Sequence, residues 1–167
     1  MAKTTIHSGL HSAIPSDASP GLLYLKQLLP IIDSLDGATS GPALLAALTP
    51  DATFSVNGGN PATPDQVAAM LAGRGERVAR FGHELCSAWD VEHDDGSGRR
   101  TLLYESVSTT VFRADPDATE LPVYEFSVVE LVPTPGGGLA GYRARETRTF
   151  MNAFVVNQKA AQLYAQK

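Results

Sequence analysis

The sequence predicts an α+β domain in which three N-terminal helical segments pack into a strongly curved, mostly antiparallel sheet. Apolar residues recur at helical spacing in the part of the chain before Arg80, and the spacing becomes two after it. Long alternating segments then follow one another through turns that are too short for parallel crossovers. We expect the sheet to close over the first helix as a cone and to leave a small-molecule pocket between them.

Composition narrows the classes of protein. The chain has 167 residues, of which 43% are apolar and 19% charged, with a formal net charge of -5. These values suit one globular domain, and the negative charge disfavours a nucleic-acid partner. The single cysteine, Cys86, excludes an internal disulfide and a cysteine-based zinc site. No apolar run has the length of a membrane span and residues 1–19 do not resemble a signal peptide, so we expect no membrane partner and a cytoplasmic location.

The first half of the chain reads as a tail followed by helices. Residues 1–19 are rich in Ser, Thr, Ala and Pro without a period, which predicts a flexible N-terminal tail ahead of a single domain over residues 20–167. Ser19 and Pro20 then begin a leucine-rich helix, and Pro30 is expected to kink or split it.

Two more helices and a strand follow. A short helix is expected over residues 42–48 and a strand over residues 51–57. The third helix begins at Thr63, with Gly73 and Gly75 as expected interruptions.

The second half alternates with the period of strands. Strands are expected from residue 80 to 92, from 102 to 112, from 123 to 131 and from 139 to 150, followed by a weakly amphipathic helix over residues 151–164. The alternation assigns one common set of faces to seven residues: His83, Ser87, Trp89, Tyr104, Ser108, Glu125 and Ser127.

At this level the chain resembles the nuclear-transport-factor-2-like (NTF2-like) superfamily, in its SnoaL-like, polyketide-cyclase-like branch. The resemblance rests on Asp51-Ala-Thr-Phe54 after the second helix, on Arg80-Phe-Gly-His83 before Trp89, and on Val123-Tyr-Glu-Phe126 before Gly138-Leu-Ala-Gly-Tyr-Arg143. It covers roughly residues 20–165 and extends more loosely to small fungal isomerases and cyclases of natural-product pathways.

The resemblance implies a cone-shaped fold with its pocket between the concave sheet face and the first helices. It also implies a homodimer through the convex face, where Tyr124, Phe126 and Val128 would form an apolar patch. Many members end the last strand with an aspartate that faces the pocket. Here the nearest positions are Thr147 and Thr149, with Glu146 directly before them.

Glu125 is the main candidate for catalysis. It is a carboxylate on a strand face otherwise occupied by Val123, Ser127 and Val129. Burial of a carboxylate is unfavourable unless it is paired, and desolvation would raise its pKa toward neutral pH. The alternative, a glutamate on the outer sheet face, is equally open, because one bulge would reverse the strand. In that case Glu105 and Glu146 are the next candidates.

Other residues could complete the pocket. His83 suits a general acid or base, although a structural histidine is an equal alternative. Tyr104 could donate a hydrogen bond to a carbonyl or alkoxide, and Trp89 could stack on a ring, while core filling is the alternative for both. The expected substrate-binding residues are Trp89, Tyr24, Ser108, Ser127 and Arg145. One of the three arginines Arg143, Arg145 and Arg148 could point inward to Glu125 or to a substrate oxygen, although a solvated outer face with cross-strand ion pairs is the stronger alternative for them.

The sequence has no cluster with metal-ligand spacing and no phosphate-binding loop, so no metal or cofactor is expected. We therefore expect an isomerase, cyclase or dehydratase that uses acid–base catalysis on a hydrophobic polycyclic natural-product intermediate. The alternative is a non-catalytic small-molecule-binding or scaffold protein on the same fold.

Overall fold

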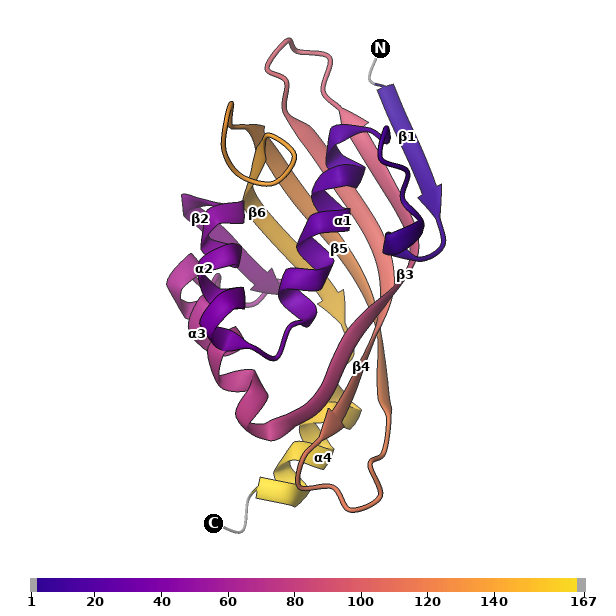
Figure 1. Ribbon diagram of the computed structural model, residues 1–167, viewed down its shortest axis with the longest axis vertical. Coiled ribbons are helices and arrows are strands. Elements are labelled where there is room, and N and C mark those ends of the chain that lie inside the picture. Colours follow the sequence, from indigo (N-terminus) through magenta and orange to yellow (C-terminus); the bar gives the residue numbers. More distant parts are fainter. Residues whose placement is uncertain (1–2, 165–167) are drawn as a thin grey trace.

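A six-stranded mixed sheet wraps around the N-terminal helices and forms the body of the molecule (Figure 1). The computed structural model describes residues 3–164. The strands lie in the order β1-β3-β4-β5-β6-β2, and every neighbouring pair is antiparallel except β2 and β6. Their bounds are β1 (Lys3–Ser8), β2 (Leu48–Val56), β3 (Val78–Glu92), β4 (Arg100–Phe112), β5 (Leu121–Pro133) and β6 (Tyr142–Met151). The predicted α+β class is confirmed, with an open sheet.

Three helices cover the concave face of this sheet. They are α1 (Pro20–Asp33), α2 (Gly37–Ala47) and α3 (Pro64–Arg77), while α4 (Phe154–Tyr164) follows the last strand. Helix α1 lies directly against the sheet and buries four leucines in the core, Leu22, Leu25, Leu28 and Leu29. Each buried leucine contributes roughly 1.5–3 kcal/mol relative to an exposed one, so this face of α1 holds the helix on the sheet. Among residues 3–164, no helix is both long and apolar enough to cross a membrane.

Helix α2 is longer than the sequence predicts, α1 and α3 are less interrupted, and α4 begins three residues later than expected. Helix α1 continues through Pro30, and α2 begins at Gly37 because the Asp36 side chain caps it by accepting a hydrogen bond from Ala38 N. Helix α3 passes through Gly73 and Gly75 without a break. A Cβ added to Gly75 would lie 2.5 Å from Leu35 O, so this glycine serves close packing against the preceding segment instead of ending the helix.

The N-terminal segment differs from the predicted flexible tail. Residues 3–8 form the edge strand β1, which pairs with β3 from Lys3 opposite Glu92 to Ser8 opposite Ser87. Ile14, a little further along, is 1% exposed and belongs to the core. Thr4, Thr5 and Ile6 are β-branched residues, and the free edge of β3 supplies the hydrogen-bond partners that the local sequence cannot reveal. Residues 1 and 2 lie outside the described part of the chain.

A buried ion pair fixes the start of α1 on the sheet. Asp90 is fully buried, accepts a hydrogen bond from Arg100 Nε at 2.7 Å, and accepts another from Gly21 N at 2.9 Å. A Cβ on Gly21 would lie 2.4 Å from Asp90 Oδ1, so only glycine allows this approach. With one end of α1 held here, its other end places Asp33 beside His83 on β3.

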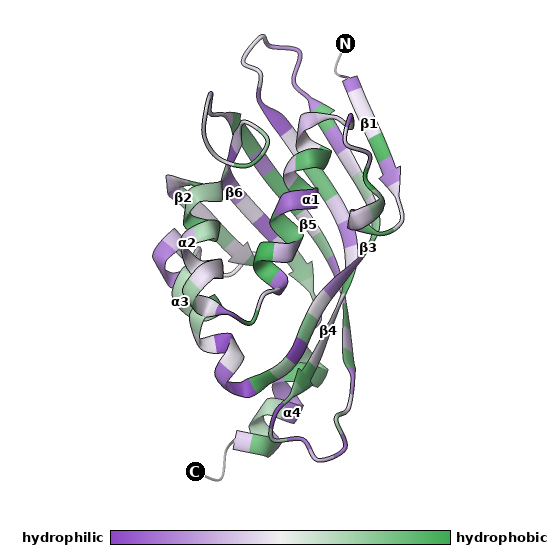
Figure 2. Cartoon of the chain, in the orientation of Figure 1, coloured by the Kyte–Doolittle hydropathy of each residue, from purple (hydrophilic) through white to green (hydrophobic). Residues whose placement is uncertain are grey.

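An irregularity in β3 decides which side chains face the helices. Leu85 pairs with Ser106 but Ser87 pairs with Glu105, so Cys86 is an extra residue, as in a β-bulge. Figure 2 shows hydrophilic and hydrophobic residues interspersed along the strands. Because of the extra residue, the alternation of β3 changes face between Leu85 and Ser87. His83 and Leu85 lie on the concave side before the bulge, and Ala88 and Asp90 lie on it afterwards.

Candidate active site

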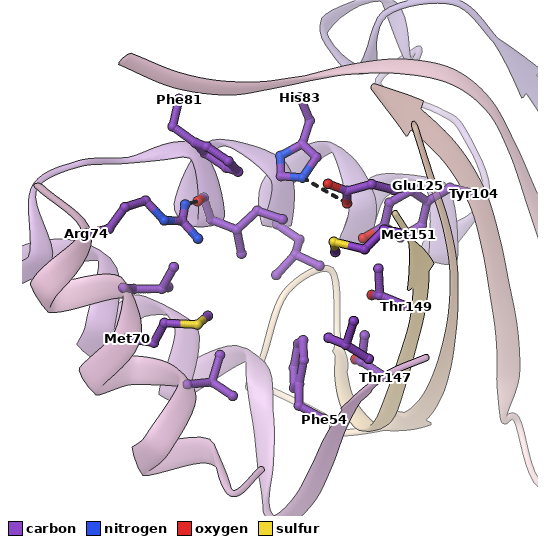
Figure 3. A pocket seen from close by; sticks show the side chains of 15 residues that line it. Phe54, Met70, Arg74, Phe81, His83, Tyr104, Glu125, Thr147, Thr149 and Met151 are labelled. Carbon is purple, nitrogen blue, oxygen red and sulfur yellow. Dashed lines mark hydrogen bonds and ion pairs between the residues drawn. The ribbon is translucent and has the colours of Figure 1, made fainter. Parts of the chain in front are cut away.

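A cavity of about 160 Å³ lies between α1, α3 and the concave face of the sheet (Figure 3). Most of its wall is apolar. Polar and charged groups enter it from α3, β3, β4, β5 and β6, and these are Arg74, His83, Tyr104, Glu125, Thr147 and Thr149. A largely apolar cavity with a few convergent polar groups has the composition of a small-molecule site.

His83 stands between two carboxylates in this cavity. Its ring Nδ1 is hydrogen-bonded to Asp33 Oδ1, and its backbone N–H donates to Asp33 Oδ2 at 3.0 Å. Its Nε2 lies 3.5 Å from Glu125 Oε2, the contact drawn as a dashed line in Figure 3. The side chains of His83 and Glu125 are only 7% and 8% exposed. The three residues therefore form one continuous chain of ionisable groups from the end of α1 to β5.

The two carboxylates change the titration of the imidazole. Burial alone would lower the pKa of His83, but hydrogen bonds and attraction from Asp33 and Glu125 outweigh it and raise the pKa to about 9. His83 is therefore protonated at neutral pH, with both ring nitrogens as donors.

Glu125 faces the cavity from the middle of β5. It pairs in register with Ser106 on one side and with Met151 on the other, both in regular parts of the ladder. Besides His83, it accepts a hydrogen bond from Ser108 Oγ. These contacts hold the carboxylate at the cavity wall and place the expected residues Glu125, His83 and Ser108 together.

Tyr104 lies deeper in the same wall, next to Glu125 in Figure 3. Burial raises the pKa of its hydroxyl to about 12, although a hydrogen bond with Ser127 lowers it in part. Ser127 is itself hydrogen-bonded to Thr149 at 2.9 Å. The hydroxyl of Tyr104 is thus neutral, and its hydrogen bond with Ser127 holds it at the cavity wall.

Thr147 and Thr149 lie on the last strand, nearest to the position where the resemblance leads us to expect an aspartate. Both are buried and line the cavity. Glu146 directly precedes Thr147 and faces away, with its Oε2 3.8 Å from Arg148 Nε. In this chain the carboxylate that lines the cavity, Glu125, comes from β5 instead of the last strand, and Asp33 of α1 is linked to the cavity through His83.

Three expected substrate-binding residues lie elsewhere. Trp89 lies on the opposite sheet face, because the extra residue Cys86 reverses the alternation of β3 before it. Arg145 is exposed, because the register of β5 and β6 shifts between Glu130 and Leu131 and leaves Arg145 outside the pairing.

Tyr24 is the third correction. It is fully buried in the core, where its hydroxyl donates to Ala47 O at 2.9 Å, and it does not line the cavity. Helix α1 presents it to the end of α2 instead of to the pocket, and its hydroxyl is already hydrogen-bonded there.

Two residues of the site were missed by sequence reasoning. Asp33 sits at the last position of α1, and Arg74 in the last turn of α3. Their partners lie 50 and 42 residues away in the sequence, so no local spacing links them. A weak signal exists for Asp33, because a carboxylate is unfavourable at a helix C-terminus and its presence there suggests a partner elsewhere.

Within residues 3–164, no group of three or more His, Cys, Asp and Glu side chains is arranged to hold a metal ion. The chain matches no family model and no curated protein at a significant level.

Solved structures do match. An NTF2-like superfamily protein from Salmonella enterica shares 17% identity over 75% of this chain and 84% of its own, with a TM-score of 0.56. BvnE pinacolase from Penicillium brevicompactum shares 12% identity over 89% of this chain and 97% of its own, with a TM-score of 0.59. A putative scytalone dehydratase from Novosphingobium aromaticivorans shares 11% identity over 77% of this chain and 79% of its own, with a TM-score of 0.59. At these identities the likeness concerns the fold, and it shows that this chain has the NTF2-like fold.

Proposed function

We propose that this protein is an acid–base enzyme that acts without a cofactor and isomerises, cyclises or dehydrates a hydrophobic natural-product intermediate. One observation carries the proposal: the Glu125 carboxylate lies in a mostly apolar cavity 3.5 Å from the imidazole of His83. A base and an acid are thus side by side in a site shielded from water, which is the requirement for moving protons on a substrate without other reagents.

The two groups have complementary roles. Glu125 accepts a proton from a carbon or hydroxyl of the substrate, since its side chain lines the cavity. Protonated His83 donates a proton to a second atom, either a carbon in an isomerisation or a leaving hydroxyl in a dehydration. Asp33 keeps the imidazole oriented through a hydrogen bond to its Nδ1, accepts a second one from the His83 backbone N–H, and stabilises the positive charge of the ring.

Tyr104 supplies a neutral donor for a developing oxyanion. A hydroxyl with a raised pKa remains protonated at neutral pH and can donate to a carbonyl oxygen as charge develops on it. Ser127 and Thr149 hold this hydroxyl in place through their own hydrogen bond.

The size of the site supports a hydrophobic ring system. A cavity of about 160 Å³ is close to the roughly 150 Å³ that accommodates a benzene ring. It continues into an outer groove of about 310 Å³ that shares five residues with it, Met70, Arg74, Phe81, Glu125 and Met151. One ring would occupy the cavity and the remainder of a polycyclic substrate the groove. The names of the matched dehydratase and pinacolase fit this class of chemistry.

The competing function is non-catalytic binding of a small molecule. A wholly apolar cavity or a solvent-facing Glu125 would favour it. The placement of Glu125 inside the cavity, beside a second proton-carrying group, supports catalysis instead.

An assay that does not require the natural substrate tests the proposal. The protein is incubated in D₂O with a panel of bicyclic and tricyclic ketones, such as 2-tetralone, and the exchange of their acidic C–H protons is followed by NMR. We expect exchange above the buffer rate that is lost in Glu125→Gln. If the wild type binds ketones of the panel but exchanges their protons no faster than buffer does, the non-catalytic function is favoured.

A further inference from the structure

Arg74 is the one cavity cation to which the acid–base proposal gives no role. It lines both the inner cavity and the outer groove, and so does Glu125. In Figure 3 its guanidinium points into the cavity from α3, across from Glu125 and Tyr104. A ligand that fills the cavity would therefore contact Arg74 at one end and the acid–base pair at the other.

Two contacts fix the guanidinium in place. Its carbon lies 4.0 Å from the centre of the Phe81 ring, and its Nη1 donates to Ile32 O at 2.5 Å. Stacking on the Phe81 ring restricts the plane of the guanidinium, and the hydrogen bond to Ile32 O restricts its rotation within that plane. The side chain is thus pre-organised, which reduces the entropy lost when it binds a ligand.

Most donors of this guanidinium are unused. Arginine carries five N–H donors, and within residues 3–164 the only acceptor found for Arg74 is Ile32 O. No described carboxylate lies within ion-pair distance of it. Burial lowers the pKa of Arg74, and attraction to the charges of Asp33 and Glu125 offsets part of this effect. A half-buried guanidinium with free N–H donors in an apolar wall is best paired with the two oxygens of one ligand group, such as a carboxylate.

Resting on the proposed function, we infer that the substrate is a cyclic carboxylic acid whose carboxylate is held by Arg74 while its ring lies against Glu125 and His83. The inner cavity has room for one ring between these two walls. The protonated imidazole of His83 offsets one of the two negative charges of Asp33 and Glu125, and the bound anion lies nearer to the guanidinium of Arg74 than to the remaining charge. Arg74 anchors the part of the substrate that does not react.

This role predicts a specific kinetic pattern. Binding energy from a non-reacting group lowers KM when it is equal in the ground and transition states. Loss of Arg74 should therefore raise KM more than it lowers kcat, whereas loss of Glu125 should lower kcat.

The test uses matched probes, benzoate against benzamide and 2-naphthoate against 2-naphthamide, each titrated into ¹⁵N-labelled protein by NMR. We expect the carboxylates to bind and to shift the signals of the cavity residues, with the amides much weaker. Arg74→Met should weaken carboxylate binding about 10- to 100-fold, the loss expected for a charged hydrogen-bond pair, and Arg74→Lys should restore part of it.

A matched control separates this from general charge loss. Arg77 lies in the same helical turn and its guanidinium is next to Tyr164, away from the inner cavity. Arg77→Met should leave binding of the probes unchanged. Equal affinity for acids and amides, no binding of either acid, or unchanged binding in Arg74→Met would each overturn the inference.

Carboxylate binding by Arg74 and proton exchange by Glu125 can be tested separately. Glu125→Gln should bind the carboxylates at least as tightly as the wild type, because it removes a negative charge from the opposite wall. If this variant loses proton exchange while carboxylates fail to bind, the acid–base function stands and the carboxylate anchor fails. If carboxylates bind through Arg74 but the wild type exchanges no protons, the anchor stands and the catalytic function fails.

Discussion

The carboxylate of Asp33, at the last position of α1, accepts hydrogen bonds from both the backbone N–H and the ring Nδ1 of His83 on β3. One short side chain thus joins the helix layer to the sheet and sets the orientation of the imidazole. The opposite ring nitrogen, Nε2, is consequently directed at Glu125. The geometry of the candidate site depends on this helix-to-sheet contact as much as on the two residues that face the cavity.

Glu125→Gln should lower turnover about 10²- to 10⁴-fold and leave the fold intact, because the amide keeps the size of the side chain but cannot accept a proton. Proton exchange or turnover measures the first effect, and thermal unfolding the second. Glu105→Gln is the matched control, since Glu105 lies on the adjacent strand with an exposed side chain. Near-normal turnover in Glu125→Gln would show that another group is the base.

Asp33→Asn should lower the pKa of His83 below about 9, because it removes the hydrogen-bond and charge partner that raises it. NMR titration of the imidazole in the two proteins measures this shift directly. Turnover should fall in the same variant, with its pH dependence moved to lower pH. An unchanged His83 titration would mean that Asp33 has a structural role only.

The stability of the protein should depend on pH through His83. A folded-state pKa of about 9, against about 6.5 in the unfolded chain, means that the stabilisation is complete below pH 6.5 and is lost as pH rises through 9. Between pH 6 and pH 10 the wild type should lose on the order of 1–3 kcal/mol relative to His83→Gln. Urea unfolding of both proteins at the two pH values tests this. A constant difference between them would contradict the shifted pKa.

Tyr104→Phe should reduce turnover roughly 10²-fold, because it removes the hydroxyl that stabilises charge developing on a substrate oxygen. Tyr24→Phe provides the contrast. Its hydroxyl donates to Ala47 O in the core, so its loss should destabilise the fold by about 1 kcal/mol without changing turnover. Steady-state kinetics and thermal unfolding of both variants give the comparison, and equal kinetics for the two would assign Tyr104 to the core.

We expect a homodimer through the convex face, where Tyr124 is 79% exposed and Phe150 47% exposed on neighbouring strands. Tyr124→Glu should shift the protein to a monomer in sedimentation velocity at micromolar concentration. Leu45→Glu, an equally drastic change of an exposed residue on α2, should not. A wild type that sediments as a monomer would rule this interface out.

The sequence by itself determined the fold class, the order of helices and strands from residue 20 onward, and the strand faces that are free of irregularities. Glu125 and Tyr104 were placed correctly because β4 and β5 pair here without a bulge, so the period of two holds along both strands. The resemblance to the NTF2-like superfamily, drawn from the order of weak motifs, was confirmed as fold by the solved structures.

Only the tertiary structure decided the rest. The extra residue at Cys86 moved Trp89 to the other face, and a bulge depends on the partner strand, which the local pattern does not contain. The edge of β3 turned the expected tail into β1. Asp33 joined the site because Asp90 holds the opposite end of α1 through Gly21. Contacts between residues far apart in sequence arise from packing, so the chain specifies them only once it has folded.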